Sequence, residues 1–372
     1  MRIGFDAKRL FNNFTGLGNY SRTTVDILAE YCPGNEYILY TPNIRHNDIT
    51  DQYTRRSCFK TVQPHGIIRG SMWRSFGIAK SARKDAIDIY HGLSNELPAG
   101  LDIPSVVTIH DVAFRTFPDM YHFTDRFTYN QKWKSACSKA DRIIAISEST
   151  KQDIIRFYGV DPDRIDILYQ PVNQLYYTDD EGICPESLRQ HVEGKPYILH
   201  VGSINSRKNL LGIVKALEML PKDMQIPLIV IGDGREYKHK VMGYIQEHKL
   251  ENLVIFTSEK IYTEGLRYLY RNAVMMVYPS FYEGFGLPVV EAILSRCPVI
   301  TSNVSSLPEA AGPDQMMADP GNPEDIADKM KRLLSDDSLR LSIAQKGYSY
   351  AMDNFHPRLL AGKLMDIYKQ MI

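Results

Sequence analysis

Residues 278–291 read Tyr-Pro-Ser-Phe-Tyr-Glu-Gly-Phe-Gly-Leu-Pro-Val-Val-Glu, and they directly follow a short apolar run, Val274 to Tyr278. An apolar run, a glycine-rich segment and a helix-like segment in this order predict a strand, a loop and a helix. Pro288 suits the first position of that helix, where a missing N–H costs no hydrogen bond. Residues Gly284 to Leu287 should therefore present backbone amides at a helix N-terminus, which is a site for an anion.

Two carboxylates flank this segment, Glu283 and Glu291, with seven residues between them. Glu291 is expected in the first helical turn, where its carboxylate can accept two hydrogen bonds from a ribose diol. Glu283 is expected in the loop beside the bound anion, where it can contact a sugar. A simpler explanation is that Glu291 complements the helix dipole and that the glycines form a tight turn.

A second loop follows the apolar run Tyr197 to Val201 and reads Gly-Ser-Ile-Asn-Ser-Arg-Lys-Asn-Leu over residues 202–210. Its cations, Arg207 and Lys208, lie at another transition from strand to helix. They can neutralise the negative charge of a diphosphate. A solvated pair of surface cations is the alternative.

Short runs rich in Val, Ile and Tyr alternate with helix-length segments along the chain, which is typical of βαβ units around a parallel sheet. The length of 372 residues exceeds that of one ordinary core, so we expect two α/β domains. The expected boundaries are a first domain over 1–170, a linker over 171–195, a second domain over 196–354 and a last helix over 355–372 that returns to the first domain. The expected strands are Arg2–Asp6, Tyr37–Tyr40, Ile87–Tyr90, Ser105–Ile109, Arg142–Ile146, Ile165–Leu168, Tyr197–Val201, Leu228–Ile231, Leu253–Phe256, Val274–Tyr278 and Val299–Ser302.

The segment from Glu283 to Glu291 resembles the donor-site signature of family-4 glycosyltransferases, and the likeness extends over most of the chain. The resemblance implies the GT-B fold, in which two Rossmann-like, doubly wound domains face each other across a cleft. It also implies a retaining hexosyltransferase that needs no metal ion and no cofactor, with a nucleotide-sugar such as GDP-mannose or a UDP-sugar as donor. Ser302 to Glu309 looks like mannosyltransferases that build surface polysaccharides, so we expect mannose as the sugar and a glycan or lipid-linked acceptor.

The resemblance also implies roles for single residues. Glu283 would contact hydroxyls of the transferred sugar and Glu291 the ribose, and Lys208 matches the lysine that binds the diphosphate. Arg207 is given the role of the family's arginine, because Ser203 stands where many members carry one. The expected donor-binding residues are Gly16, Gly18, Ser203, Arg207, Lys208, Gly232, Ile261, Phe285, Gly286, Leu287 and Glu291.

His110 directly follows the run Ser105 to Ile109, and strands of open α/β sheets end at the ligand crevice. Thr108 to Asp111 looks like the family segment whose histidine lies against the donor sugar, so the expected catalytic residues are His110 and Glu283. His110 would stabilise developing positive charge through its backbone carbonyl rather than act as a base. A purely structural histidine is the alternative, as a plain turn is for Gly16, Gly18 and Gly232.

Basic and acidic side chains balance at 44 each, so no global field favours nucleic acid as a partner. Residues 54–84 are the exception, because they carry eight basic side chains and no acidic one. The stretch predicts a solvated basic face, a peripheral contact with anionic lipid at the inner face of the membrane, or a contact with the diphosphate of a lipid-linked acceptor. Its interleaved apolar residues are Ile67, Ile68, Met72, Trp73 and Phe76.

The charged start of the chain and the absence of an apolar run near ~18 residues predict a cytoplasmic protein. Asp161-Pro162-Asp163 matches a metal-binding signature of other glycosyltransferases, but its proline predicts a turn. No metal site is therefore expected. Two alternative functions keep the same architecture, a nucleotide-sugar epimerase that needs no acceptor and a non-enzymatic sugar-binding protein.

Overall fold

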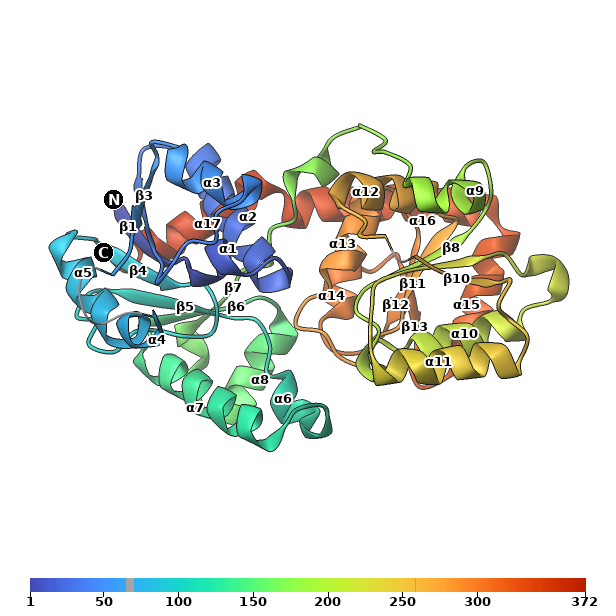
Figure 1. Cartoon of the computed structure of the whole chain (residues 1–372), viewed down its shortest axis with the longest axis horizontal. Helices are drawn as coiled ribbons and strands as arrows, with labels where there is room; N and C mark the ends of the chain where they lie inside the picture. Colours follow the sequence, from blue (N-terminus) through green and yellow to red (C-terminus); the bar gives the residue numbers. More distant parts are fainter. Residues whose placement is uncertain (65–69, 258) are drawn as a thin grey trace. The chain divides into compact units, whose positions relative to one another are not determined.

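The computed structural model describes residues 1–64, 70–257 and 259–372, and it divides into two compact units (Figure 1). Unit 1 consists of Met1–Pro171 together with Phe355–Ile372, and unit 2 consists of Val172–Asn354. Each unit is a parallel sheet covered by helices and has its own hydrophobic core. The prediction of two Rossmann-like α/β domains is confirmed.

Unit 1 contains a seven-stranded parallel sheet in the order β3-β2-β1-β4-β5-β6-β7. The chain order reverses between β1 and β4, which is the point where open α/β sheets bind their ligands at the carboxyl ends of the strands. The strands are β1 (Arg2–Asp6), β2 (Glu36–Tyr40), β3 (Phe59–Val62), β4 (Ile89–Gly92), β5 (Ser105–Ile109), β6 (Arg142–Ala145) and β7 (Ile165–Ile167).

The last helix of the chain packs against unit 1. Pro357 occupies the first turn of this helix, and His356 before it has extended backbone angles, because proline disfavours a helical conformation in the residue that precedes it. Leu360, Leu364 and Tyr368 of the helix lie in the core of unit 1, which confirms the predicted return. The helices of unit 1 are α1 (Lys8–Asn12), α2 (Gly16–Tyr31), α3 (Asp48–Arg55), α4 (Gly70–Met72), α5 (Ile78–Lys84), α6 (Ala113–Thr116), α7 (Phe123–Lys139), α8 (Glu148–Tyr158) and α17 (Pro357–Lys369).

Unit 2 contains a six-stranded parallel sheet in the order β10-β9-β8-β11-β12-β13, with its reversal between β8 and β11. The strands are β8 (Ile198–Val201), β9 (Leu228–Ile231), β10 (Val254–Phe256), β11 (Met275–Tyr278), β12 (Val299–Ser302) and β13 (Met316–Ala318). The helices are α9 (Arg189–Val192), α10 (Leu210–Met219), α11 (Glu236–Glu247), α12 (Thr263–Asn272), α13 (Leu287–Leu294), α14 (Leu307–Ala311), α15 (Pro323–Ser335) and α16 (Asp337–Phe355), which runs to the first residue of the returning segment of unit 1.

All eleven expected strands are present, with ends that shift by at most two residues, as in Ile87–Tyr90 against the observed Ile89–Gly92. Two strands, β3 and β13, have no counterpart in the sequence-based prediction. Both lie at the outer edge of their sheet and are short. Edge strands need little apolar patterning because one side of the strand has no neighbour.

The segment expected to be a linker, 171–195, lies along α12 of unit 2. Arg267 donates to the carbonyl and the hydroxyl oxygens of Thr178, and the Ile183 amide donates to the Glu264 carbonyl at 3.2 Å. Gly182 has a φ of +79°, and a Cβ there would lie 2.3 Å from the Glu264 carbonyl oxygen. The segment is therefore held by specific contacts within unit 2.

The basic stretch 54–84 is largely neutralised in the fold. Five of its basic side chains pair with carboxylates outside the stretch or at its end, among them Arg74, which is buried between Asp6 and Glu96. Trp73 is also buried, whereas Met72 and Phe76 are exposed. Ile67, Ile68 and Arg69 lie outside the described residues.

Candidate functional site

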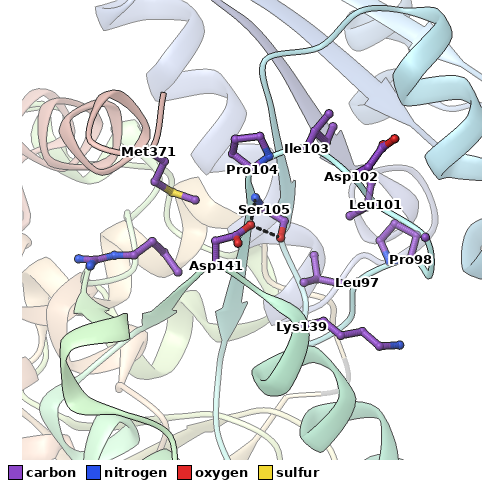
Figure 2. A pocket seen from close by; sticks show the side chains of 12 residues that line it. Leu97, Pro98, Leu101, Asp102, Ile103, Pro104, Ser105, Lys139, Asp141 and Met371 are labelled. Atoms are coloured by element: carbon purple, nitrogen blue, oxygen red, sulfur yellow. Dashed lines mark hydrogen bonds between the residues drawn. The ribbon is translucent and has the colours of Figure 1, made fainter.

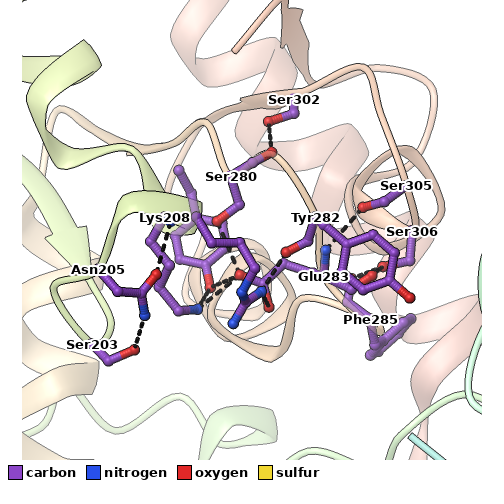
Figure 3. A network of polar contacts seen from close by, with 12 residues as sticks. Ser203, Asn205, Lys208, Ser280, Tyr282, Glu283, Phe285, Ser302, Ser305 and Ser306 are labelled. Carbon is purple, nitrogen blue, oxygen red and sulfur yellow. Dashed lines mark hydrogen bonds and ion pairs between the residues drawn. The ribbon is translucent and has the colours of Figure 1, made fainter. Parts of the chain in front are cut away.

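Glu283 lies at the centre of a network of polar contacts in unit 2, and Figure 3 shows Lys208 and Glu283 pointing toward one another. Its Oε1 atom accepts hydrogen bonds from Lys208 Nζ at 2.8 Å, Ser280 Oγ at 2.9 Å and Tyr278 OH at 3.0 Å. Its Oε2 atom lies 2.8 Å from a guanidinium nitrogen of Arg207. The residues come from the loops after β8 and β11, so the structure brings together the carboxylate and both cations that the sequence singles out.

The cluster is buried and contains two cations that pair with Glu283. The side chains of Lys208, Arg207 and Glu283 are 11%, 19% and 12% exposed, and two cations face one carboxylate. Burial alone would raise the pKa of Glu283, but Lys208 and Arg207 outweigh it and lower the pKa to about 2. Burial would lower the pKa of Lys208, but Tyr278 and Glu283 raise it above its usual value. Glu283 and Lys208 are therefore both charged at neutral pH.

Serine hydroxyls hold the loop that carries Glu283. Ser306 Oγ donates to the carbonyl oxygens of Glu283 and Phe285, each at 2.8 Å, and Ser305 Oγ accepts from the Glu283 amide at 3.0 Å. Ser302 donates to the Ser280 carbonyl. These bonds tie the loop to Ser305 and Ser306, the two residues that precede α14. The sequence contains the signal, a run of small hydroxyl residues after β12, but sequence reasoning used it only as a family likeness.

The amide cluster predicted at the start of α13 has the expected helix. Gly286 precedes α13 with a φ of +119°, and a Cβ there would lie 2.9 Å from a methyl carbon of Leu307, so only glycine fits. The helix begins at Leu287, which places Pro288 second rather than first. Glu291 is consequently the fifth helical residue, and its predicted place in the first turn is wrong.

Glu291 lies in a separate, aromatic environment. Tyr270 OH donates to its carboxylate at 3.2 Å, and Tyr176 hydrogen-bonds to it as well. Burial raises the pKa of Glu291 to about 7, although both tyrosines act in the opposite direction. The structure gives Glu291 no contact with the cluster around Glu283 among the described residues. Sequence reasoning missed both tyrosines, because they lie far from Glu291 along the chain.

The loops after β8 and β9 run against each other, backbone to backbone. The Gly202 amide donates to the Ile231 carbonyl at 2.9 Å, and the Ile204 amide to the Asp233 carbonyl at 2.8 Å. Gly232 has a φ of +148°, and a Cβ there would lie 1.9 Å from the Gly202 carbonyl oxygen. Gly232 is thus required by packing.

The other two residues predicted in unit 2 lie in loops. Ser203 Oγ accepts a hydrogen bond from the Asn205 side-chain amide at 2.9 Å, in the same loop as Lys208. Ile261 is half-buried just before α12, and its side chain lies beside Gly265. Only Ser203 therefore shares a loop with the Glu283 network.

His110 belongs to unit 1 and is 5% exposed. Its Nε2 atom lies 2.8 Å from the Leu93 carbonyl oxygen, which can only accept, so Nε2 carries the proton. Its Nδ1 atom accepts from Gln170 Nε2 at 2.9 Å. Burial lowers the pKa of His110 to about 4. The ring is neutral at pH 7 with both nitrogens occupied, which agrees with a role other than that of a base.

Gly16 and Gly18 open α2 and differ in their surroundings. Asn13 Oδ1 accepts from the amides of Thr15 at 2.9 Å and Gly18 at 3.1 Å. A Cβ on Gly18 would lie 1.7 Å from the Asn13 carbonyl oxygen, whereas nothing lies within 4 Å of a Cβ on Gly16. Gly18 is therefore required by packing, whereas packing does not require a glycine at position 16.

Two further features lie apart from these residues. A cavity of about 600 Å³ lies at the amino ends of β5 and β6, and Figure 2 shows its lining, where the Ser105 amide and hydroxyl donate to Asp141 at 2.8 and 3.0 Å. Ligands of open α/β sheets bind at the opposite, carboxyl ends. Asp161 caps a short turn over Pro162–Arg164, as predicted. No cluster of three metal-binding side chains occurs among the described residues.

Comparisons with known proteins place the chain in a family. Residues 187–350 match the model of glycosyl transferases group 1, and residues 15–174 match the model of glycosyltransferase family 4. The O-antigen chain mannosyltransferase B of Escherichia coli is 31% identical over 365 residues, which cover 94% of this chain and 95% of that protein. No helix in the described part of the chain has the length and apolarity that crossing a membrane requires.

Solved structures agree on the fold. A glycosyltransferase from Rickettsia africae superposes with a TM-score of 0.76 at 20% identity, and covers 100% of this chain and 98% of its own. Anabaena HepE in complex with UDP and glucose gives a TM-score of 0.75 at 17% identity, with complete coverage of both chains. These similarities, the two parallel sheets and the full-length relative lead to one conclusion. The chain belongs to family 4 of the glycosyltransferases, and is a retaining enzyme with the GT-B fold from a family whose members work without a metal ion.

Proposed function

We propose that this enzyme transfers mannose from GDP-mannose to a glycan or lipid-linked acceptor during the synthesis of a surface polysaccharide. The likeness to the O-antigen chain mannosyltransferase extends over nearly the full length of both proteins, which supports mannose as the sugar. Family membership already excludes the two alternatives, an epimerase and a sugar-binding protein without activity. A UDP-sugar remains the competing donor, since HepE was solved with UDP.

The observation that carries the proposal is the pair of buried cations, Lys208 and Arg207, on Glu283 in the loop before α13. A donor diphosphate would replace Glu283 as the ion-pair partner of Lys208 and Arg207. It would also accept hydrogen bonds from the backbone amides of Phe285, Gly286 and Leu287. Glu283, released from its cations, would then accept hydrogen bonds from hydroxyls of the transferred sugar. Binding thus replaces one set of charge-assisted hydrogen bonds with another, and the buried cations are never left without an anion.

The other predicted residues keep the roles that the family resemblance implies. Glu291 would hold the ribose, with Ser203, Gly232 and Ile261 near the nucleotide. In unit 1, Gly16, Gly18 and the segment at His110 would serve the phosphates, the acceptor and the transferred sugar. The proposed reaction uses no side chain of the enzyme as a nucleophile. The bond from the anomeric carbon to the diphosphate breaks, and the departing diphosphate keeps the electron pair. The acceptor hydroxyl then bonds to that carbon from the same face and gives its proton to the leaving phosphate oxygen.

The test is a donor panel with a mannose-terminated acceptor. The purified enzyme is incubated with GDP-mannose, GDP-glucose, UDP-glucose and UDP-N-acetylglucosamine, and nucleotide release and the anomeric proton of the product are measured. We expect transfer from GDP-mannose with an α-configured product. Transfer from a UDP-sugar alone would overturn the choice of donor, and an inverted product would overturn the proposed chemistry.

We also propose a peripheral contact between residues 54–84 and an anionic membrane surface at the cytoplasmic face. Exposed Met72 and Phe76 lie four residues apart on a continuous helical stretch, and Lys80 and Lys84 follow on its exposed side. This pairing of apolar and basic side chains suits an anionic interface. Flotation of wild type and of the double variant Met72→Ser/Phe76→Ser with anionic and with neutral vesicles tests it. If both proteins float equally with both kinds of vesicle, the contact is rejected.

A further inference from the structure

A chain of buried hydrogen bonds in unit 1 leads from the last helix to the surroundings of His110. Tyr368 on α17 and His91 on β4 are both 0% exposed, and Tyr368 OH lies 2.6 Å from His91 Nδ1. His91 Nε2 lies 2.8 Å from Thr108 Oγ1, and Thr108 Oγ1 lies 3.0 Å from Tyr20 OH. Four side chains from α17, β4, β5 and α2 are thus joined without contact with water.

The chain has one proton arrangement that satisfies its groups. The Tyr368 hydroxyl has no other hydrogen-bond partner in the described part of the chain, so it donates to His91 Nδ1. Burial, with His110 nearby, lowers the pKa of His91 to about 3, so the ring is neutral and carries its proton on Nε2. Nε2 then donates to Thr108 Oγ1, which donates in turn to Tyr20 OH. The Tyr20 hydroxyl proton can then turn to Thr24, its second side-chain partner, whereas the opposite direction would leave the Tyr368 proton buried and unpaired, which is costly.

The chain of hydrogen bonds ends at Tyr20, whose ring contacts the ring of His110. The rings of Tyr20 and His110 lie edge to face, with centroids 4.5 Å apart and planes at 87°. Since Thr108 holds the Tyr20 hydroxyl, Tyr20 cannot rotate without breaking a buried hydrogen bond. Leu93 and Gln170 hold the two nitrogens of the His110 ring, and Tyr20 restrains the ring by a third contact.

We propose that Tyr368, His91, Thr108 and Tyr20 are positioning residues that hold the His110 ring, and with it the backbone of residue 110, in its orientation, and that helix α17 is therefore part of the apparatus for sugar transfer. The consequence for catalysis rests on the role proposed above for His110. None of the four residues needs to touch the substrate.

The experiment compares two substitutions that each remove one buried tyrosine hydroxyl in unit 1. Tyr368→Phe breaks the chain. Tyr37→Phe is the matched control, because the Tyr37 hydroxyl is equally buried and donates to the carbonyls of Leu28 at 2.8 Å and Cys32 at 2.7 Å, outside the chain. The readouts are the ring nitrogen shifts of His110 in protein labelled with ¹⁵N-histidine, assigned with His110→Gln, and the kinetics of transfer.

We expect the Nε2-protonated pattern of His110 in all three proteins, because Leu93 sets the tautomer, and ring nitrogen resonances that are displaced in Tyr368→Phe but not in Tyr37→Phe. Transfer by Tyr368→Phe should show kcat reduced about tenfold with the KM for the donor within about twofold, because misplacement of a group costs rate rather than donor binding. A His110 pattern in Tyr368→Phe identical to that of wild type would overturn the inference.

A second pair keeps the two proposals distinguishable. Thr108→Val and Tyr368→Phe do not contact each other, so their effects on kcat should add unless the chain couples them. A double variant no slower than the slower single variant supports the chain, and simple additivity contradicts it. An altered His110 pattern with unchanged kcat in Tyr368→Phe would support the positioning chain and overturn the separate role of His110 in transfer.

Discussion

The substitution Glu283→Gln removes the carboxylate that pairs with both Lys208 and Arg207, while keeping the shape of the side chain. The magnitude follows from the pKa of Glu283, which falls from its usual 4.5 to about 2 in the folded state. Each pKa unit corresponds to about 1.4 kcal/mol, so the charge of Glu283 stabilises unit 2 by about 3 kcal/mol at pH 7. The side chain is only 12% exposed, so screening by solvent is small. The value agrees with the about 3–5 kcal/mol lost when one partner of a buried ion pair is removed.

The sign of the pH dependence is fixed by the direction of the shift. Because the folded-state pKa is lowered, the stabilisation is present above pH 4.5 and is lost as the pH falls toward 2. At pH 3.5 about 2 kcal/mol of the original 3 should remain. The difference between wild type and Glu283→Gln should therefore shrink by about a third between pH 7 and pH 3.5.

Hydrogen exchange of the β11 and β12 amides is the suitable assay, because it reports on unit 2 alone, whereas both tryptophans, Trp73 and Trp133, lie in unit 1. Glu251→Gln, at an exposed position before β10, is the control and should leave the opening free energy unchanged. The reasoning fails if Glu283→Gln behaves like this control, or if its difference from wild type is the same at both pH values.

Four further predictions concern Glu291, the glycines that open α2, and Ser306. Glu291 has a pKa of about 7 and must be ionised to accept hydrogen bonds from the ribose diol. In calorimetric titrations the affinity of wild type for GDP should therefore rise about tenfold from pH 6 to pH 8, while the affinity of Glu291→Gln stays constant. The same raised pKa means that the stability of unit 2 falls as the pH rises from 4.5 to about 7, and a constant stability over this window would contradict the burial of Glu291. Gly18→Ala should destabilise unit 1 by about 2 kcal/mol or more because its Cβ would meet Asn13, whereas Gly16→Ala should cost nothing. Melting followed by tryptophan fluorescence measures both variants, and equal melting temperatures would contradict this prediction. Ser306→Ala should weaken GDP binding about tenfold by freeing the carbonyls of Glu283 and Phe285, and an unchanged dissociation constant would remove the serine from the account.

Much of the fold could be predicted from the sequence because buried parallel strands are continuous apolar runs. Ile198–Val201 and Met275–Tyr278 are apolar at nearly every position, and both were expected within one residue. The edge strands β3 and β13 could not be found in this way. The sequence Phe-Lys-Thr-Val of β3 alternates too briefly, and Met-Met-Ala of β13 contains no β-branched residue.

The candidate site was predictable where the chemistry depends on neighbours along the chain or on strand ends. Glu283, Lys208 and Arg207 follow adjacent strands, β11 and β8, so the carboxyl edge of the sheet brings them together. The phase of α13 was not predictable to one residue, since Pro288 fits its first two positions equally well, and Glu291 moved out of the first turn as a result. The Tyr176 and Tyr270 contacts with Glu291 depend on how distant segments pack and leave no pattern in the sequence.

The central claim is that the cations beside Glu283 hold the diphosphate of the donor. Calorimetric titration of GDP into wild type and Lys208→Met tests it most directly, with Lys240→Met as a control at an exposed position of α11 in the same unit. We predict that Lys208→Met binds GDP about a hundredfold more weakly than wild type, as expected for the loss of a charge-assisted contact, and that Lys240→Met binds like wild type. Equal affinity of wild type and Lys208→Met for GDP, with both proteins folded, would contradict the account.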